Sequence, residues 1–375
     1  MYIRRTALLD MNLIRDDERG FASAVSRLAH CNPFLPERVD LERQALGAQF
    51  VPLGGTWHAR GESELRPNLS RLQERSEAFV PAVRERLVAG GRFAPQELSI
   101  YADGAVYLLF ERYEHDFLQL IIGAHPARPR VAFYHRFRRD FDSLLALPGI
   151  TLPDAQDPLH IFACLFQVRR AFHFIFQNIL GGSMAAARLR AAVWQSIFTR
   201  DMRRYRRSLY QRMGDMATLI SGPSGTGKEL VARAIGLARY IPFDPEREAF
   251  AEDFAGAFYA LNLSALSPTL IESELFGHRR GAFTGALQDR SGWLDVCPQF
   301  GAVFLDEIGE LDVAIQVKLL RVLQSRTFQR LGDTRDRTFR GKIIAATNRD
   351  LKREILTGRF REDFYYRLCS DLIST

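Results

Sequence analysis

Cysteine is scarce in this sequence, and no apolar run is long. The four cysteines are scattered over 375 residues, without a close pair or the spacing of metal ligands, which argues against structural disulfides. The longest apolar stretch, Ile161–Leu180, is interrupted by polar and charged side chains, and residues 1–20 lack the apolar centre of a signal peptide. We therefore expect a cytoplasmic protein that does not contact a membrane.

Internal repeats and low-complexity segments are not evident, and the charge is only mildly unbalanced. Hydrophobic residues at 47% and charged residues at 25% predict an ordinary core, and the length suits two domains. The net charge of +7 fits an anionic partner such as nucleotide or nucleic acid, and an arginine-rich solvated surface equally well. The densest basic run, Arg200–Arg212, is expected to be a solvated helix face, with a contact to phosphates or a neighbouring subunit as the alternative.

Residues 1–177 contain no chemical motif, and we treat them as a first domain of α+β type. Ser70–Val88 has apolar positions at helical spacing. Leu98–Glu111 predicts a hairpin, because apolar residues flank an Asp-Gly pair at 103–104. Asp116–Gly123 and Arg130–Arg136 are expected to add further strands. His160–Asn178 is predicted to be a helix, and a core helix of this domain is favoured over a signalling or dimerising one.

Residues 178–375 alternate between strand-like and helix-like segments. Four short apolar runs predict strands, and a fifth begins at the end of the chain: Ala217–Ser221, Ala257–Leu263, Ala302–Leu305, Lys342–Thr347 and Asp371–Thr375. Asp312–Ser325 is predicted to be a helix. This alternation is typical of an α/β fold with helices on both faces of a parallel sheet.

A glycine-rich loop joins the first of these strands to the helical run Glu229–Arg239. It consists of Gly222, Pro223, Ser224, Gly225, Thr226, Gly227 and Lys228. This is the Walker A context, in which glycines let backbone N–H groups approach phosphates and the lysine supplies a charge. The residue after the lysine is Glu229 instead of the usual Ser or Thr, so a hydroxyl ligand for Mg²⁺ is missing.

The apolar run Gly301–Leu305 ends in two carboxylates, Asp306 and Glu307. A strand buried in an open α/β sheet delivers its last residues to the carboxyl edge, where ligands bind. There Asp306 would hold Mg²⁺ and Glu307 would orient and polarise the attacking water, which suffices for phosphoryl transfer from ATP. Capping of the following helix is the weaker alternative.

From Ile179 to Thr375 the chain closely resembles the AAA+ domain of the sigma-54-dependent transcriptional activators. The matching segments stand in order: GPSGTGKELVARAI, LNLSAL, ESELFGHRRGAFTGA, GAVFLDEIGEL, KLLRVLQ, IIAATNRDL and GRFREDFYYRL. The resemblance implies an AAA+ P-loop core that hydrolyses ATP to remodel sigma-54 RNA polymerase holoenzyme. Members of this family also carry a glutamate after the Walker A lysine, so Glu229 supports the assignment.

The resemblance also implies roles for single residues. Asn262 matches the switch asparagine that can hydrogen-bond the Walker B glutamate, here Glu307, and Asn348 matches sensor I. Arg361 and Arg367 match two arginine fingers that reach the nucleotide site of a neighbouring subunit, which implies a ring, usually a hexamer.

The most specific feature is the hexapeptide Gly281, Ala282, Phe283, Thr284, Gly285 and Ala286. In the family this loop contacts sigma-54, with Phe283 and Thr284 at its working end. Flanking glycines permit a tight, mobile loop, and the phenylalanine is expected to offer an exposed apolar anchor.

The sequence departs from the family pattern in three places. Arg279 stands where an acidic residue is common, Met202–Asp215 is longer than usual, and nothing follows Thr375. We therefore expect the helical lid and a C-terminal DNA-binding helix-turn-helix to be absent. A truncated, inactive nucleotide-binding regulatory or oligomerisation module remains the alternative. Residues 1–177 would by position be a regulatory or sensor domain, without a receiver-domain set of acidic residues.

Overall fold

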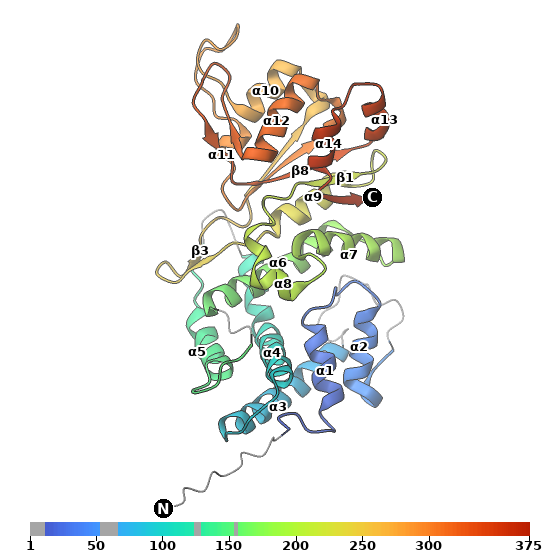
Figure 1. Ribbon diagram of the computed structural model, residues 1–375, viewed down its shortest axis with the longest axis vertical. Coiled ribbons are helices and arrows are strands. Elements are labelled where there is room, and N and C mark those ends of the chain that lie inside the picture. The colour runs from blue at the N-terminus through green and yellow to red at the C-terminus, as the bar shows by residue number, and fades with distance from the viewer. Residues whose placement is uncertain (1–11, 53–66, 124–128, 154–156) are drawn as a thin grey trace, which may run out of the picture.

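The computed structural model describes residues 12–52, 67–123, 129–153 and 157–375. The expectation that residues 1–20 are not a signal peptide therefore falls mostly outside the described residues. Six helices form the N-terminal half in the described residues: Arg19–Leu28 (α1), Glu37–Leu46 (α2), Pro67–Val88 (α3), Pro95–Ile122 (α4), Tyr134–Leu145 (α5) and Pro158–Asn178 (α6). No strand occurs among the described residues before 178, so the expected α+β class is wrong for this half. Figure 1 shows these helices grouped below the sheet.

The predicted hairpin at Leu98–Glu111 is the main error, because this segment lies inside α4. The Asp-Gly pair sits in mid-helix, where the carboxylate of Asp103 is buried and accepts hydrogen bonds from Ser26 and His30. Residues 101–106 are buried on every side, so the segment has neither helical nor strand periodicity, and such a run is ambiguous by pattern alone. The strands expected at Asp116–Gly123 and Arg130–Arg136 are wrong too, since they belong to the end of α4 and the approach to α5.

The helices predicted at Ser70–Val88 and His160–Asn178 are confirmed as α3 and α6. By length and composition α6 could cross a membrane, contrary to the expectation from its interrupting polar residues. However, 61% of its apolar window is buried within the fold, as in the core helix of a soluble protein. Its first half packs in the core of the helical half, and its second half packs against Met184–Phe198 (α7) and Lys228–Leu237 (α9).

The C-terminal half contains a five-stranded parallel sheet, which confirms the predicted α/β class. The strand order is Phe258–Asn262 (β4), Ala302–Asp306 (β5), Lys342–Thr347 (β8), Thr218–Ser221 (β1) and Asp371–Ser374 (β9). Every predicted strand is present. The remaining elements are Met202–Arg207 (α8), Pro268–Phe276 (α10), Trp293–Val296 (α11), Val313–Ser325 (α12), Leu351–Leu356 (α13), Glu362–Leu368 (α14), and the short hairpins Phe243–Asp244 (β2) with Ala249–Phe250 (β3) and Thr327–Phe328 (β6) with Arg337–Thr338 (β7).

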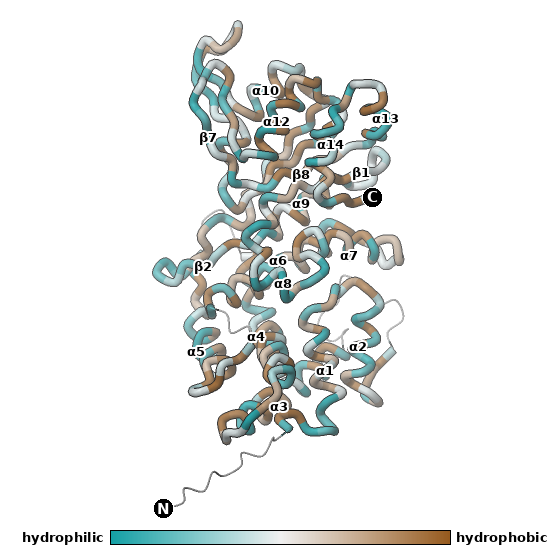
Figure 2. The backbone as a smooth tube through the Cα atoms, in the orientation of Figure 1, coloured by the Kyte–Doolittle hydropathy of each residue, from teal (hydrophilic) through white to brown (hydrophobic). Residues whose placement is uncertain are grey.

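Alternate strand residues serve two cores, one on each face of the sheet. Leu219, Leu305 and Ile343 pack with α10, α12 and α14, whereas Ile220 and Ile344 pack with α7 and α9. This alternation is the period-two geometry of a strand covered on both sides. Figure 2 shows the hydrophobic strands enclosed between the helices.

The two halves are tied together by shared packing and by charge. The β2–β3 hairpin and Phe254 join the core of the helical half. Arg203 and Arg206, from the basic run Arg200–Arg212, reach the buried carboxylate of Asp103 in α4. The expected solvated helix face is therefore wrong for these two arginines, because they contact the helical half. The division near Asn178 remains a prediction.

Candidate nucleotide site and contact loop

The glycine-rich loop leaves the carboxyl end of β1 and enters α9 at Lys228. Gly225 and Gly227 have φ of +80° and +82°, the left-handed region in which a Cβ is strained, and nothing lies within 4 Å of a Cβ built on Gly225. The Lys228 side chain is buried, and its Nζ donates to the carbonyls of Gly222 and Pro223 at 3.1 Å each. The loop is thus a backbone cradle with a cation held across it.

The other loop residues are exposed or partly exposed. Thr226 donates to the carbonyl of Pro223 at 2.9 Å, and its hydroxyl lies 2.6 Å from that of Thr375. Glu229 points along α9 and accepts from Arg233 at 3.3 Å. It therefore makes an ordinary i,i+4 pair on the helix surface in place of a metal-binding hydroxyl.

The carboxyl ends of β4, β5 and β8 bring the predicted acidic and amide residues to one edge. Asn262 is the register partner of Asp306. Glu307 has φ of +56°, a left-handed conformation that is uncommon for a non-glycine residue. Its N–H donates to Asp306 at 3.0 Å, and its own carboxylate accepts the backbone N–H of Asn348 at 3.3 Å. Four predicted residues therefore meet beside the phosphate loop.

One predicted contact is not formed in this structure. The amide oxygen of Asn262 accepts from the backbone N–H of Ser264 at 3.0 Å and from its hydroxyl at 2.8 Å. Within the described residues, no hydrogen bond joins Asn262 to Glu307. A short local bond is available to the asparagine without any long-range positioning, so it caps the 3₁₀ turn Leu263–Ala265.

Arg361 and Arg367 both stand at α14. Arg361 forms a bidentate pair with Asp363, at 3.0 Å and 2.7 Å, and this partner raises the pKa of the guanidinium above its usual value. Arg367 is exposed and donates to the carbonyl of Leu323 at 3.1 Å and 3.2 Å. Neither side chain contacts the phosphate loop of its own chain among the described residues.

The hexapeptide Gly281–Ala286 forms a tight loop between α10 and α11. Gly281 and Gly285 have φ of +81° and +99°, and the N–H of Gly281 closes the loop on the carbonyl of Ala286 at 2.8 Å. Phe283 is half-buried, with its ring 5.0 Å from that of His278, whereas Thr284 is exposed. The expected exposed anchor at Phe283 is thus partly covered. The next residue after the loop, Leu287, is 82% exposed, and the sequence analysis did not single it out.

A second loop, between β6 and β7, supports the first. The N–H of Leu331 donates to Gly277 at 3.0 Å, and that of Arg279 donates to Leu331 at 3.0 Å. The Arg279 side chain pairs with Asp289 and Asp333. The pKa of each carboxyl lies below its usual value, mainly because the carboxylate accepts a backbone N–H and further because Arg279 is bound to it. The basic residue that departs from the family pattern therefore bridges the two loops.

Comparison with known proteins agrees with this geometry. Residues 197–373 match the family model described as the Sigma-54 interaction domain. Over 154 residues, or 41% of this chain, the sequence is 49% identical to the anaerobic nitric oxide reductase transcription regulator NorR of Escherichia coli O1:K1 and of Escherichia coli O157:H7. The chain spans 28% of the length of those relatives.

Among solved structures, NtrX from Brucella abortus in complex with ATP shares 22% identity at a TM-score of 0.40, covering 65% of this chain and 47% of that one. The complex of the same protein with ADP also shares 22% identity at a TM-score of 0.40, covering 72% of this chain and 52% of that one. The fold and the family match agree: residues 197–373 include an α/β domain with a five-stranded parallel sheet, and they are similar to the Sigma-54 interaction domain. More particularly, a stretch of 154 residues is similar to the transcription regulator NorR.

Proposed function

We propose that residues 178–375 bind ATP with Mg²⁺ and hydrolyse it in a ring of identical subunits, a hexamer, to remodel sigma-54 RNA polymerase holoenzyme. The observation that carries this proposal is the convergence of Lys228, Asp306, Glu307 and Asn348 at one edge of the sheet. The same sheet leads, through β4 and α10, to the loop Gly281–Ala286. One domain thus holds both a phosphate cradle and a contact loop.

The residues at the cradle fit a nucleoside triphosphate. Lys228 is a buried cation that donates to two carbonyls, and an anionic phosphate satisfies it better than neutral oxygens do. The first N–H groups of a helix have no partner within it, so those at the start of α9, with those of the glycine loop, would bind phosphate oxygens. Lys228 would bind the β- and γ-phosphates, and ATP would supply the phosphoryl group that is transferred.

Asp306 fits a magnesium site, because carboxylate oxygens are the ligands that Mg²⁺ prefers. One of its oxygens accepts the N–H of Glu307 at 3.0 Å, which fixes the carboxylate at the strand end. Glu307 would accept a proton from, and orient, the attacking water. Its left-handed backbone and the bond from Asn348 hold the carboxylate in place for that task.

Arg361 and Arg367 would act on the site of the neighbouring subunit. Each now bonds within its own chain, so ring assembly would exchange the Asp363 and Leu323 partners for phosphate oxygens. When the γ-phosphate is bound, the Asn262 side chain would give up its hydrogen bonds with Ser264 and form one with Glu307. That exchange would loosen the turn Leu263–Ala265 that precedes α10, and α10 ends at the base of the contact loop.

The test measures ATP turnover and open-complex formation with sigma-54 holoenzyme on the same preparation. Turnover should rise more steeply than linearly with protein concentration, since the arginines act between subunits. Thr284→Ala should abolish open-complex formation and leave turnover within about twofold, because Thr284 is exposed and, among the described residues, forms no hydrogen bond to the phosphate loop. Thr357→Ala, at another exposed threonine, is the matched control.

Two results would overturn the proposal. Turnover absent at every concentration, with ATP still bound, would favour the truncated regulatory module. Loss of turnover together with remodelling in Thr284→Ala would remove the case for a dedicated contact loop.

A further inference from the structure

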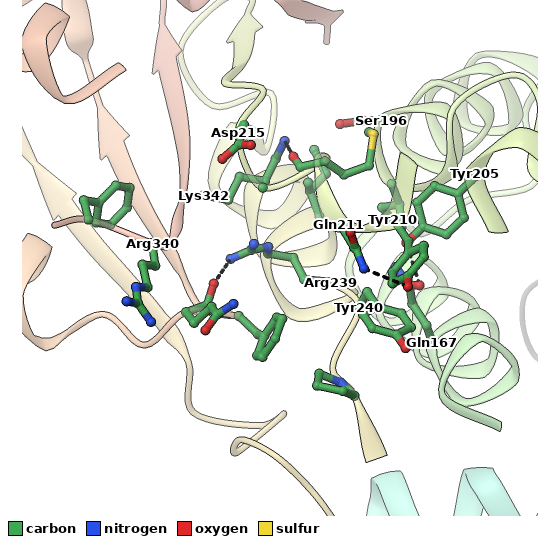
Figure 3. A pocket seen from close by; sticks show the side chains of 18 of the residues that line it. Gln167, Ser196, Tyr205, Tyr210, Gln211, Asp215, Arg239, Tyr240, Arg340 and Lys342 are labelled. Carbon is green, nitrogen blue, oxygen red and sulfur yellow. Dashed lines mark hydrogen bonds between the residues drawn. The ribbon is translucent and has the colours of Figure 1, made fainter. Parts of the chain in front are cut away.

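A cavity of about 570 Å³ lies at the junction of the two halves, at the opposite end of the sheet from the phosphate loop. Its walls come from the amino ends of β1 and β8, the end of α9, and the segment that carries α8. Figure 3 shows Lys342 and Arg239 on the sheet side and Tyr205, Tyr240 and Gln167 on the helical side. Its volume is in the range of sites for small organic ligands.

The sheet side of the cavity presents two cations, of which Lys342 is buried and Arg239 is partly buried. The Lys342 side chain is 3% exposed, and its Nζ donates to the carbonyls of Met216 at 2.7 Å and Met213 at 3.3 Å. Arg239 donates to the carbonyls of Gln299 and Gly301. Within the part of the chain that the structure describes, no carboxylate lies at ion-pair distance from either cation.

The one acid on the cavity wall is already engaged. Asp215 pairs with Arg326 at 2.9 Å, and its side chain is 68% exposed. Arg326 also donates to the carbonyls of Gly341 and Gly214. The wall therefore carries four basic side chains against one carboxylate: Arg239, Arg326, Arg340 and Lys342. Two acids that do not line the cavity also act on these cations through their charge, Asp371 on Lys342 and Glu252 on Arg239.

That excess is costly for the folded protein. Burial lowers the pKa of Lys342 to about 7 and that of Arg239 to about 10. A cation that is removed from water and hydrogen-bonded to neutral carbonyls is unfavourable, so burial favours loss of the proton from Lys342 unless an anion lies beside it. An anion in the cavity would supply the opposite charge.

The helical side presents aromatic rings and polar groups. Tyr210 and Tyr240 lie with ring centroids 4.6 Å apart, and the Tyr205 hydroxyl donates to Gln167 at 2.7 Å. Such a wall suits a flat, partly apolar group, since rings stack on rings and the hydroxyls can serve polar substituents.

We propose that this cavity binds a small organic anion, with a carboxylate or phosphate directed at Lys342 and Arg239 and a ring against Tyr210 and Tyr240. Such a ligand would touch α6, the approach to β1 and the start of β8 at once. It would therefore join the helical half to the strand that leads into the phosphate loop, roughly 20 Å away along the sheet.

The experiment is a calorimetric titration of the whole chain with benzoate, phenyl phosphate and inorganic phosphate. It is done in the Lys228→Ala background, so that phosphate groups do not occupy the nucleotide loop. We expect saturable binding of benzoate or phenyl phosphate, stronger than that of inorganic phosphate because the ring adds contacts. Benzoate binding without phenyl phosphate binding, or the reverse, identifies which anionic group the site accepts.

Lys342→Met, made in the same background, should weaken the affinity about 10- to 100-fold, as expected when one buried charged hydrogen bond is lost. Lys352→Met, at an exposed lysine on α13, is the matched control and should bind like the parent. Circular dichroism of Lys342→Met checks that it folds. If it does not fold, Tyr210→Leu, which removes a ring from the cavity wall, is titrated instead and should weaken ring-bearing probes alone.

Three outcomes would overturn the proposal. They are no saturable binding of any of the three probes, equal binding by the parent and the folded Lys342→Met, and equal weakening by Lys352→Met. Each would mean that the cations serve only to hold the carbonyls of the neighbouring segments. None of these outcomes bears on ATP turnover, which is measured separately.

Discussion

Gln167 of α6 donates a hydrogen bond to the carbonyl of Ala238, the residue that ends α9, at 3.0 Å. Arg170, one turn further along α6, donates to the carbonyl of Leu237. A helix of the N-terminal half therefore caps the helix that begins at Lys228. Through this cap the two halves of the chain share a structural element of the phosphate site.

Gln167→Met should lower the free energy of unfolding by about 1–3 kcal/mol, because the carbonyl of Ala238 and the hydroxyl of Tyr205 both lose a buried partner. Urea denaturation measures the change. Gln177→Met, at an exposed position of the same helix, should cost less than about 0.5 kcal/mol. Equal losses in the two variants would show that the cap contributes nothing specific.

Asp103→Asn should destabilise the protein by about 3 kcal/mol at neutral pH, because Arg203 and His30 lose a buried carboxylate. Burial alone raises the pKa of Asp103, but hydrogen bonds from His30 and Ser26 and the charge of Arg203 outweigh it, so the pKa lies below its usual value. The stability that the Asp103 carboxylate contributes is complete above about pH 3.9, the pKa of an aspartate in the unfolded chain. It is lost as the pH falls through the lower pKa that Asp103 has in the folded protein.

Unfolding measured from pH 7 down to pH 3 tests this pH dependence. The gap between the parent and Asp103→Asn should narrow below about pH 4. Asp17→Asn, at an exposed aspartate, should follow the parent throughout. A gap that stays constant with pH would mean that the carboxylate keeps its ordinary pKa in the fold.

Glu307→Gln should reduce ATP turnover by about 10²- to 10⁴-fold while nucleotide affinity changes little, since the amide keeps the size of the side chain but cannot accept a proton from water. Steady-state turnover and a binding titration with ATP separate the two effects. Glu310→Gln, at an exposed glutamate three residues on, is the control. If both variants keep full turnover, the assigned role of Glu307 is wrong.

Arg279→Glu should loosen the contact loop, because it would place a third carboxylate between Asp289 and Asp333. Amide hydrogen exchange at Gly281 should become about tenfold faster, the equivalent of about 1.4 kcal/mol of lost protection. Arg280→Glu, where the side chain is exposed, should leave that exchange near the parent rate. Unchanged exchange in Arg279→Glu would contradict the bridging role of this arginine.

The C-terminal half was largely predictable because its signals are local. Glycines at fixed spacing after a short apolar run predict the phosphate loop, and each apolar run of four to seven residues contains a strand. The helical half was mispredicted where a turn-forming residue pair lies in a segment that the fold buries. The Asp-Gly pair at 103–104 normally indicates a turn, but the surrounding residues are buried on all sides of α4, and tertiary packing overrides turn propensity there.

The contacts of single side chains were less predictable than the elements that carry them. Asn262 reached the expected strand end, yet its amide bonds to Ser264, because a neighbour two residues away competes with a distant partner. Asp333 and Leu287 had no motif to single them out. Asp333 became relevant only when the two loops were found to pair, and Leu287 only through its exposure beside the hexapeptide.

By itself the sequence determined the α/β class of the C-terminal half, and it predicted a phosphate loop and a contact loop, since these depend on residue type and spacing along the chain. Only the tertiary structure decided that α6 caps α9, that Arg203 and Arg206 reach Asp103, and that Lys342 and Arg239 share a cavity wall. Such relationships join residues tens to hundreds of positions apart. They follow from how helices pack and where charges can be buried, which no local pattern encodes.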